Sequence, residues 1–265
     1  MSEVILVDQA DGVATLTFNR PAVRNAIDQE KIGLLQSTLA RLEHDPTVRV
    51  LILTGAGGHF VAGGDITFFE KSKDWTPNER RHQFESVVHR IHPVVLTLRR
   101  MAKPVIAKIR GAAAGWGVSL VMACDLAIAA DDARFNLGYT LIGACPEGSG
   151  SFFLPRMVGL KKAMELALLS ERFDAAQALA LGIVNRVVPV AELDGATSEL
   201  ARRLAAGPTF AYGVTKRLIN SALTSSLEQQ MQAEAEGFAA CAASEDFAEG
   251  ARAFLERRKP DFKGR

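Results

Sequence analysis

The chain has 265 residues, 48% of them hydrophobic, which is enough to bury a sizeable core as one large domain or as one domain with a helical extension. Its 31 basic and 30 acidic residues nearly balance and form no long single-sign run, which argues against a nucleic-acid partner. The 3 cysteines are dispersed, and no histidine cluster has ligand-like spacing, so neither a disulfide framework nor a metal site is expected. Without a signal peptide or a membrane-spanning apolar run, we expect a cytoplasmic protein with no membrane partner.

The first elements are predicted to be a β-hairpin followed by strand–helix alternation. Residues 4–7 and 13–18 are β-rich runs separated by the turn sequence QADG. Asp28 can cap a helix that runs to about Glu43, and residues 48–53 form an almost continuous apolar run. Such a run is typical of a strand covered on both faces, as in sheets with crossover helices.

Two glycine-rich turns each enter a predicted helix. The first is TGAGGHFVAGGDITFFE, after which a polar loop over 71–77 and a long helix over 78–101, interrupted or kinked near Pro93, are expected. The second lies in KPVIAKIRGAAAGWGVSLVMACD, which predicts a strand over 105–109 and a helix over 116–124. Because the first N–H groups of a helix lack partners within it, each turn can offer one to a negatively charged oxygen. The alternative is that these glycines only allow close packing.

The remainder of the chain supplies one notable carboxylate and a helical region. After a strand over 125–130, ARFNLGYTLIGACPEGSG begins as a strand and ends as a loop. Pro146 and Glu147 are predicted to lie in the first turn of a helix that runs toward Met157. Beyond Lys161, alanine and leucine stripes predict helices to about Arg257, with a short strand over 183–188, that pack on the core or on another subunit.

Two N–H donors and one carboxylate form an arrangement that suits thioester chemistry. The donors can stabilise the oxyanion that develops on a carbonyl, and Glu147 can act as the base that removes the acidic α-proton of a thioester. The alternative is that Glu147 is an ordinary glutamate stabilised by the start of a helix. A serine hydrolase is not indicated, because Ser119 and Ser149 do not fit the G-x-S-x-G pattern and no histidine follows Ser149.

Four ordered segments carry a resemblance to a known family: NRPAVRNAID, LILTGAGGHFVAGGDI, KPVIAKIRGAAAGWGVSLVMACDLAIAADDARF and LALGIVNRVVP. Together they resemble the enoyl-CoA hydratase/isomerase, or crotonase, superfamily over essentially the whole chain. The resemblance implies an α/β fold: a spiral of ββα units, here over residues 1–200, and a C-terminal helical trimerisation region over 201–265. It also implies a coenzyme A thioester as the substrate, no separate cofactor, and a homotrimer or a hexamer of paired trimers.

The family's site residues carry over onto the two turns. The resemblance implies that the oxyanion is held by the N–H groups of Gly64 and Trp116, although glycine is usual at the second position and the indole can reshape the acyl pocket. The remaining residues implied to bind the substrate, largely through backbone groups around the coenzyme, are Val23, Arg24, Ala62, Asp65, Ile66 and Tyr139. For Arg24, a solvated loop arginine is an equal alternative. Lys259 could reach the coenzyme in a neighbouring subunit, or belong to a disordered basic tail.

Carboxylate positions separate the reactions of this family. Hydratases place two glutamates around a water, and the matching positions here are Ser119 and Tyr139, which are not carboxylates. Glu147 is similar to the single catalytic glutamate of the delta-3,delta-2-enoyl-CoA isomerase branch, so the sequence predicts a proton shuttle from C2 to C4 of a 3-enoyl-CoA. The alternatives are an enoyl-CoA hydratase, a ring-modifying or otherwise specialised enzyme of the family, and a non-catalytic acyl-CoA-binding protein.

The proton affinity of Glu147 depends on two opposing effects. An apolar surround of Phe135, Leu141, Ile142 and Trp116 is expected to raise its pKa, whereas the start of a helix would lower it. The sequence leaves open which effect is larger.

Overall fold

The computed structural model describes residues 4–27 and 31–265. Within these residues the main sheet has six strands in the order β1-β2-β3-β4-β6-β9. Its strands are β1 (Ile5–Ala10), β2 (Val13–Phe18), β3 (Val50–Gly55), β4 (Val105–Ile109), β6 (Leu126–Ala130) and β9 (Arg186–Val188). The expected hairpin is confirmed, since β1 and β2 are antiparallel, and every later neighbour pairs in parallel. A second, three-stranded sheet consists of β5 (Ala112–Ala114), β7 (Arg134–Asn136) and β8 (Phe173–Asp174).

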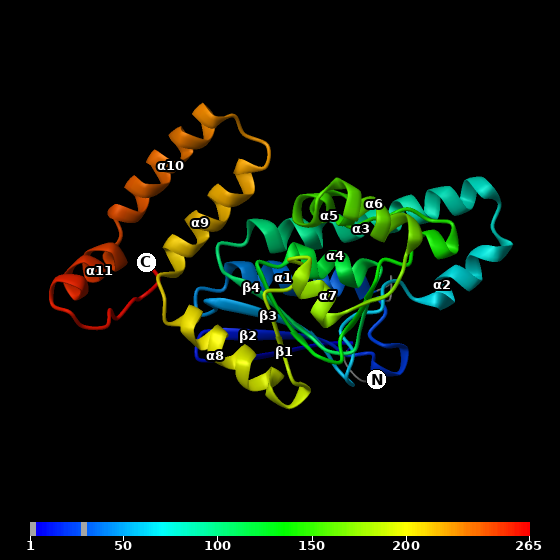
Figure 1. The fold of residues 1–265 in the computed structure, drawn as a ribbon, viewed down its shortest axis with the longest axis horizontal. Helices are drawn as coiled ribbons and strands as arrows, with labels where there is room; N and C mark the ends of the chain where they lie inside the picture. Colours follow the sequence, from blue (N-terminus) through cyan, green and yellow to red (C-terminus); the bar gives the residue numbers. More distant parts are fainter. Residues whose placement is uncertain (1–3, 28–30) are drawn as a thin grey trace.

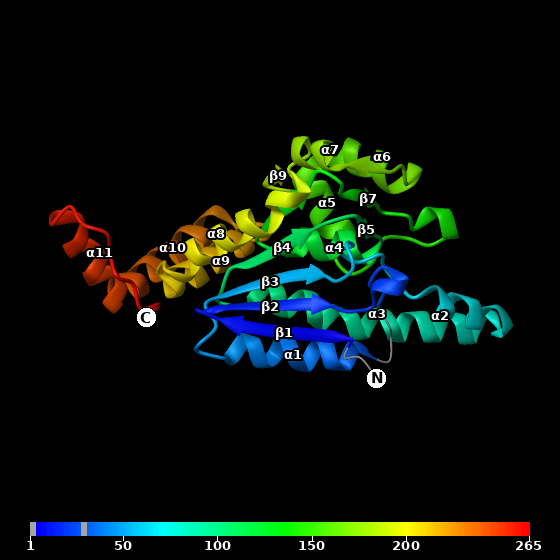
Figure 2. The ribbon, with the colours of Figure 1, turned by 90° about the horizontal axis from the view of Figure 1, so that it is seen from below.

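Helices lie on both faces of the main sheet and continue beyond it (Figure 1, Figure 2). Their bounds are α1 (Ile32–His44), α2 (Ile66–Lys71), α3 (Pro77–Arg100), α4 (Trp116–Ala123), α5 (Gly150–Val158), α6 (Leu160–Leu169), α7 (Ala175–Ala180), α8 (Leu193–Ala205), α9 (Thr209–Ala222), α10 (Leu227–Ala242) and α11 (Glu245–Leu255). Short 3-10 turns are η1 (Pro21–Val23), η3 (Ser72–Asp74), η4 (Thr140–Ile142) and η5 (Val190–Glu192). None of the helices in the described residues is both long enough and apolar enough to span a membrane.

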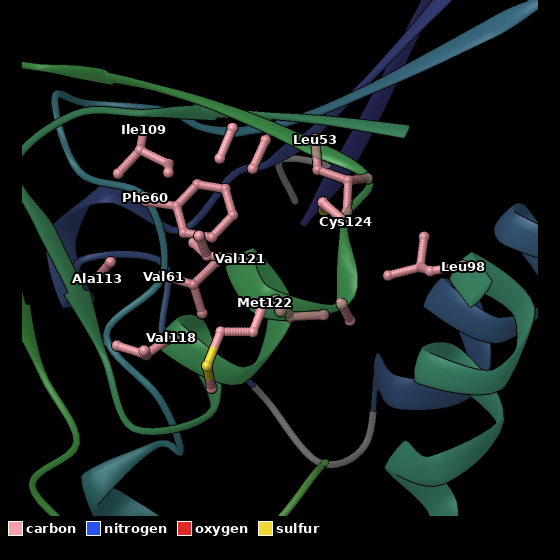
Figure 3. Close-up of a cluster of buried hydrophobic side chains, with 14 of the residues drawn as sticks. Leu53, Phe60, Val61, Leu98, Ile109, Ala113, Val118, Val121, Met122 and Cys124 are labelled. Atoms are coloured by element: carbon pink, nitrogen blue, oxygen red, sulfur yellow. The ribbon is translucent and has the colours of Figure 1, made fainter. Parts of the chain in front are cut away.

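The strand β3 shows why its run of apolar residues is continuous. Leu51 and Leu53 belong to the main core beneath α1, α3 and α4, whereas Val50 and Ile52 pack with residues of α8 on the other face. Since side chains alternate across a strand, a strand covered on both faces needs apolar residues at every position. Figure 3 shows part of this main core, in which Phe60 and Val121 are both buried.

Several predicted elements differ in their bounds. The helix expected from Asp28 begins at Ile32, and Asp28 itself lies outside the described residues. The interruption expected at Pro93 is wrong, because α3 continues through it. The loop expected over 71–77 includes the turn η3, and the last strand is limited to Arg186–Val188.

The C-terminal helices α9 to α11 extend from one end of the molecule, and α2 lies at the opposite end (Figure 1, Figure 2). The helix α8 packs on the main sheet, because its residues Ala201 and Ala205 cluster with Val50, Ile52 and Ile106 of the strands. The predicted division between residues 200 and 201 therefore falls within α8, and a separate helical region stays a prediction.

Candidate functional site

The two glycine-rich turns lie against each other. Main-chain hydrogen bonds join the segment after β3 to β5, from the Phe60 amide to the Ala112 carbonyl (3.0 Å) and from the Ala114 amide to the Val61 carbonyl (2.9 Å). A Cβ atom on Gly63 would lie 3.2 Å from the Ala114 carbonyl oxygen, so only glycine allows this approach without displacement. The close packing of the two turns brings Gly64 and Trp116 into one region of the molecule.

The amides of Gly64 and Trp116 are available as donors. Ile27 bonds to the residues on either side of Gly64 rather than to Gly64 itself. The Ile27 amide donates to the Gly63 carbonyl, and the Ile27 carbonyl accepts from the Asp65 amide. Trp116 is the first residue of α4, where no carbonyl of the helix can reach the amide. Within the part of the chain that the structure describes, neither amide nitrogen donates to a protein acceptor.

Glu147 lies just before α5, in a site shielded from solvent. The prediction that it occupies the first turn of a helix is wrong, because α5 begins at Gly150. Its Oε1 accepts a hydrogen bond from the Tyr139 hydroxyl at 3.0 Å, and its main-chain carbonyl accepts one from the Ser119 hydroxyl at 3.0 Å. Burial raises the pKa of Glu147 to about 7, although the Tyr139 hydrogen bond opposes this increase. Of the two opposing effects on the pKa of Glu147 that the sequence left open, burial is therefore the larger.

The residues that surround Glu147 are only partly those predicted. Leu141 and Ile142 are 70% and 62% exposed, so the expectation that they shield the carboxyl is wrong. Phe135 is fully buried but stacks on Phe173, whose ring centroid lies 5.3 Å away. The indole of Trp116, which is only 3% exposed, packs against Gly148, the residue that follows Glu147.

Tyr139 connects Glu147 to the second turn. A Cβ atom on Gly115 would lie 3.9 Å from Cζ of the Tyr139 ring, and the hydroxyl at the end of that ring donates to Glu147. Burial raises the pKa of Tyr139 above its usual range, so its hydroxyl stays a neutral donor. Tyr139 can therefore orient the carboxyl without titrating in the same pH range.

Two of the residues predicted to bind the coenzyme line a common cleft, and Glu147 is not among the residues that line it. Arg24 and Ala62 line a cleft of about 880 Å³, and their loops are joined by a hydrogen bond from the Ala62 amide to the Arg24 carbonyl (3.0 Å). Val23 and Ile66 are exposed, at 38% and 76%. Lys259 lies in the exposed C-terminal segment.

Asp65 has a structural role. Its carboxylate accepts from the Thr67 amide at the start of α2 and pairs with Arg20 at 2.7 Å. Burial disfavours ionisation of Asp65, but the bonds from Thr67 and Arg20 outweigh it and keep the pKa of this carboxyl below its usual value. Asp65 is thus an ionised carboxylate whose oxygens are already bonded to Thr67 and Arg20, so it is not suited to carry a proton.

Asn25 was not singled out in the sequence, yet it holds the first loop to the site. Its side-chain amide donates to the carbonyls of Ala56, His59 and Phe60, and its Oδ1 accepts from the Arg20 amide. Asn25 has φ of 59° and is only 1% exposed. The signal that could have revealed it is the asparagine within NRPAVRNAID, because asparagine tolerates the left-handed conformation.

Similar proteins match nearly the whole length of the chain. The sequence model of the family described as "Enoyl-CoA hydratase/isomerase" matches residues 8–265. The chain is 38% identical to the 1,2-epoxyphenylacetyl-CoA isomerase of Escherichia coli (strain K12), over 100% of both chains. It is 36% identical to the 4-chlorobenzoyl coenzyme A dehalogenase-2 of an Arthrobacter species, over 92% of this chain and 88% of that relative. An enoyl-CoA hydratase structure from Polaromonas sp. JS666 has a TM-score of 0.91 and 32% identity, and the match covers 98% and 99% of the two chains.

Proposed function

Since the chain belongs to the enoyl-CoA hydratase/isomerase family, we propose that it is an acyl-CoA double-bond isomerase with Glu147 as its proton shuttle. The carboxylate of Glu147 removes a proton from C2 of a 3-enoyl-CoA, and the electrons form a dienolate on the thioester. The same carboxyl then returns the proton to C4, which leaves the double bond between C2 and C3. The proposal takes the coenzyme A thioester as the substrate and needs no separate cofactor.

The observation that carries the proposal is the environment of the Glu147 carboxyl. Glu147 is shielded from solvent with a pKa of about 7, which suits a group that must first accept and then return a proton near neutral pH. Asp65, the other acidic residue predicted for the site, is engaged by Arg20 and α2. Hydration would need a second acid or base to handle water, and the matching positions hold Ser119 and Tyr139.

The two turns supply electrostatic stabilisation of the dienolate. The unpaired amides of Gly64 and Trp116 are the donors that we assign to the thioester oxygen. Preorganised donors of this kind contribute roughly 3–4 kcal/mol each to a transition state that carries a developing oxyanion. Arg24 and Ala62, on joined loops at the cleft, are assigned to the coenzyme, and the cation of Arg24 is available to a phosphate.

The test compares two substrates and two variants. Wild-type protein is incubated in D2O with a 3-enoyl-CoA and, separately, with a 2-enoyl-CoA, and products are followed by mass spectrometry and nuclear magnetic resonance. We expect double-bond migration with 3-enoyl-CoA, and Glu147→Gln should reduce it by about 10²–10⁴-fold while acyl-CoA affinity is retained. The matched control is Glu171→Gln, because Glu171 is exposed. Hydration of the 2-enoyl-CoA without migration would assign a hydratase, and binding without turnover would assign a non-catalytic acyl-CoA-binding protein.

The match to the E. coli relative favours a second candidate, a specialised isomerase of ring-modified acyl-CoA. That relative is named as an isomerase of 1,2-epoxyphenylacetyl-CoA and matches the full length of this chain. The same Glu147 and the same two amides would serve such a reaction. Turnover of 1,2-epoxyphenylacetyl-CoA that depends on Glu147, together with no migration in 3-enoyl-CoA, would favour this candidate over the first.

A further inference from the structure

Three buried polar atoms, one on Glu147 and two on residues near it, have no hydrogen-bond partner among the described residues. In the described part of the chain, the buried side-chain polar atoms in this condition are Nε1 of Trp116, Oε2 of Glu147 and Oγ of Ser149. Most buried polar atoms in folded proteins have partners, and each orphan costs about 1–3 kcal/mol. It is therefore significant that all three belong to one small region rather than to scattered sites.

The three residues meet around Gly148. A Cβ atom on Gly148 would overlap Cδ1 of the Trp116 indole and lie 2.5 Å from its Nε1, so the polar edge of the indole rests on this glycine. Glu147 and Ser149 are the two chain neighbours of Gly148. The indole N–H thus lies at Gly148, and the two oxygen atoms belong to the residues on either side of this glycine.

The free hydroxyl of Ser149 is unusual for its place in the fold. Ser149 is the N-cap residue of α5, where serine commonly accepts a hydrogen bond from an amide of the first turn. Here its φ is 78° and its side chain makes no capping bond. The hydroxyl therefore remains available to a group other than the helix.

Together these atoms are suited to an oxygen of the ligand. The indole N–H is a donor only, whereas the serine hydroxyl can donate or accept. We propose that the acyl group accepted by this enzyme carries an oxygen atom beyond the thioester, and that this oxygen accepts hydrogen bonds from Trp116 Nε1 and Ser149 Oγ. This inference rests on the proposed function, because it places the acyl group beside Glu147.

Entry of the acyl group must separate the indole from the loop. Each of the three atoms is closed to water, so they gain partners only when the ligand parts Trp116 from the 147–149 segment. A purely space-filling indole would instead leave the N–H without a function, and phenylalanine would then serve equally well.

The experiment measures binding rather than turnover. Isothermal titration calorimetry gives the dissociation constants of butyryl-CoA, 3-hydroxybutyryl-CoA and 4-hydroxybutyryl-CoA for wild type, Trp116→Phe and Ser149→Ala. In wild type, at least one hydroxylated thioester should bind about 5–10-fold more tightly than butyryl-CoA, as expected for a net hydrogen-bond contribution of about 1–1.4 kcal/mol. Trp116→Phe, which retains the backbone amide, should bring the ratio of hydroxylated-thioester to butyryl-CoA affinity close to one. Ser149→Ala, a smaller change, should reduce the ratio in part.

Each outcome decides the proposal. A wild-type preference that disappears in Trp116→Phe supports it. Equal affinities for all three thioesters in wild type, or a preference that survives in both variants, would overturn it. The proposed function is tested separately by double-bond migration, so failure of that activity with an intact binding preference would remove the isomerase assignment and leave the oxygen contact standing.

Discussion

The hydrogen bond from Tyr139 to Glu147 should tune the pH at which the enzyme works. Tyr139→Phe keeps the ring that lies beside Gly115 but removes the donor 3.0 Å from the carboxyl. A hydrogen bond to a charged group contributes about 1.5–3 kcal/mol, and one pH unit corresponds to about 1.4 kcal/mol. Because the tyrosine stabilises the ionised carboxylate, its loss should raise the pKa of Glu147 from about 7 by about one to two pH units.

The assay is the pH dependence of kcat/KM for proton removal from the acyl-CoA. Glu147 must be ionised to accept the proton, so kcat/KM rises with pH through the pKa of the free enzyme. In Tyr139→Phe this acidic limb should move to higher pH, with a rate about 5–50-fold lower at pH 7 that recovers at alkaline pH. The matched control is Tyr212→Phe, which changes the tyrosine of α9 and should leave the limb unchanged. An acidic limb that stays in place, or moves to lower pH, in Tyr139→Phe would refute the reasoning.

Two further substitutions test the packing of the site and of the C-terminal helices. Gly148→Ala should reduce kcat/KM by at least about tenfold, because the new Cβ overlaps the indole beside it, whereas Gly143→Ala carries a similar positive φ but meets nothing within 4 Å and should retain activity. Equal losses in the two variants would assign the effect to backbone strain alone. Lys216→Met should lower the free energy of unfolding by about 1.5–3 kcal/mol in urea denaturation, because the Asp125 carboxylate loses its charged partner at 2.7 Å and keeps only the more distant cation of Arg99, at 3.7 Å, and the Val105 amide. Lys162→Met, in an exposed pair, should change it by less than about 1 kcal/mol, and a similar small effect for Lys216→Met would contradict the prediction.

The sequence predicted the strands and the turns well because their signals are local. The strand Val105–Ile109 has the predicted bounds, since Pro104 precedes an apolar run and glycines follow it. The two turns could be placed next to each other by resemblance, but their contact depends on pairing between the segment at Phe60 and the strand at Ala112, which are far apart in the chain. Long-range pairing of this kind leaves no periodic pattern in either segment.

The start of α5 could not be predicted from its composition. Pro146 and an acidic residue are common in the first turn of a helix, and this signal placed Glu147 inside it. Gly148 and Ser149 instead have φ of 57° and 78°, which an α-helix does not allow, so the helix can begin only at Gly150. These two dihedral angles place Glu147 outside the helix.

Burial of the apolar residues near Glu147 was also predicted only in part. Apolar residues are frequent on protein surfaces, so the character of Leu141 and Ile142 does not determine whether they are buried. Trp116 is buried as expected, but its contact with Gly148 depends on two loops from different parts of the chain. A candidate site built from loops is therefore less predictable than the strands that carry them.

Tyr139 gives the clearest physical argument for one proton carrier rather than two. By resemblance it stands where a hydratase has a glutamate, yet its buried hydroxyl remains protonated and donates to Glu147. A second carboxylate at that distance would repel the first and force one of the pair to hold a proton. The neutral Tyr139 hydroxyl instead stabilises the ionised form of Glu147, whereas burial raises the proton affinity of Glu147. The balance of these two effects keeps the pKa of Glu147 at about 7, where a single carboxyl can both take up and release a proton.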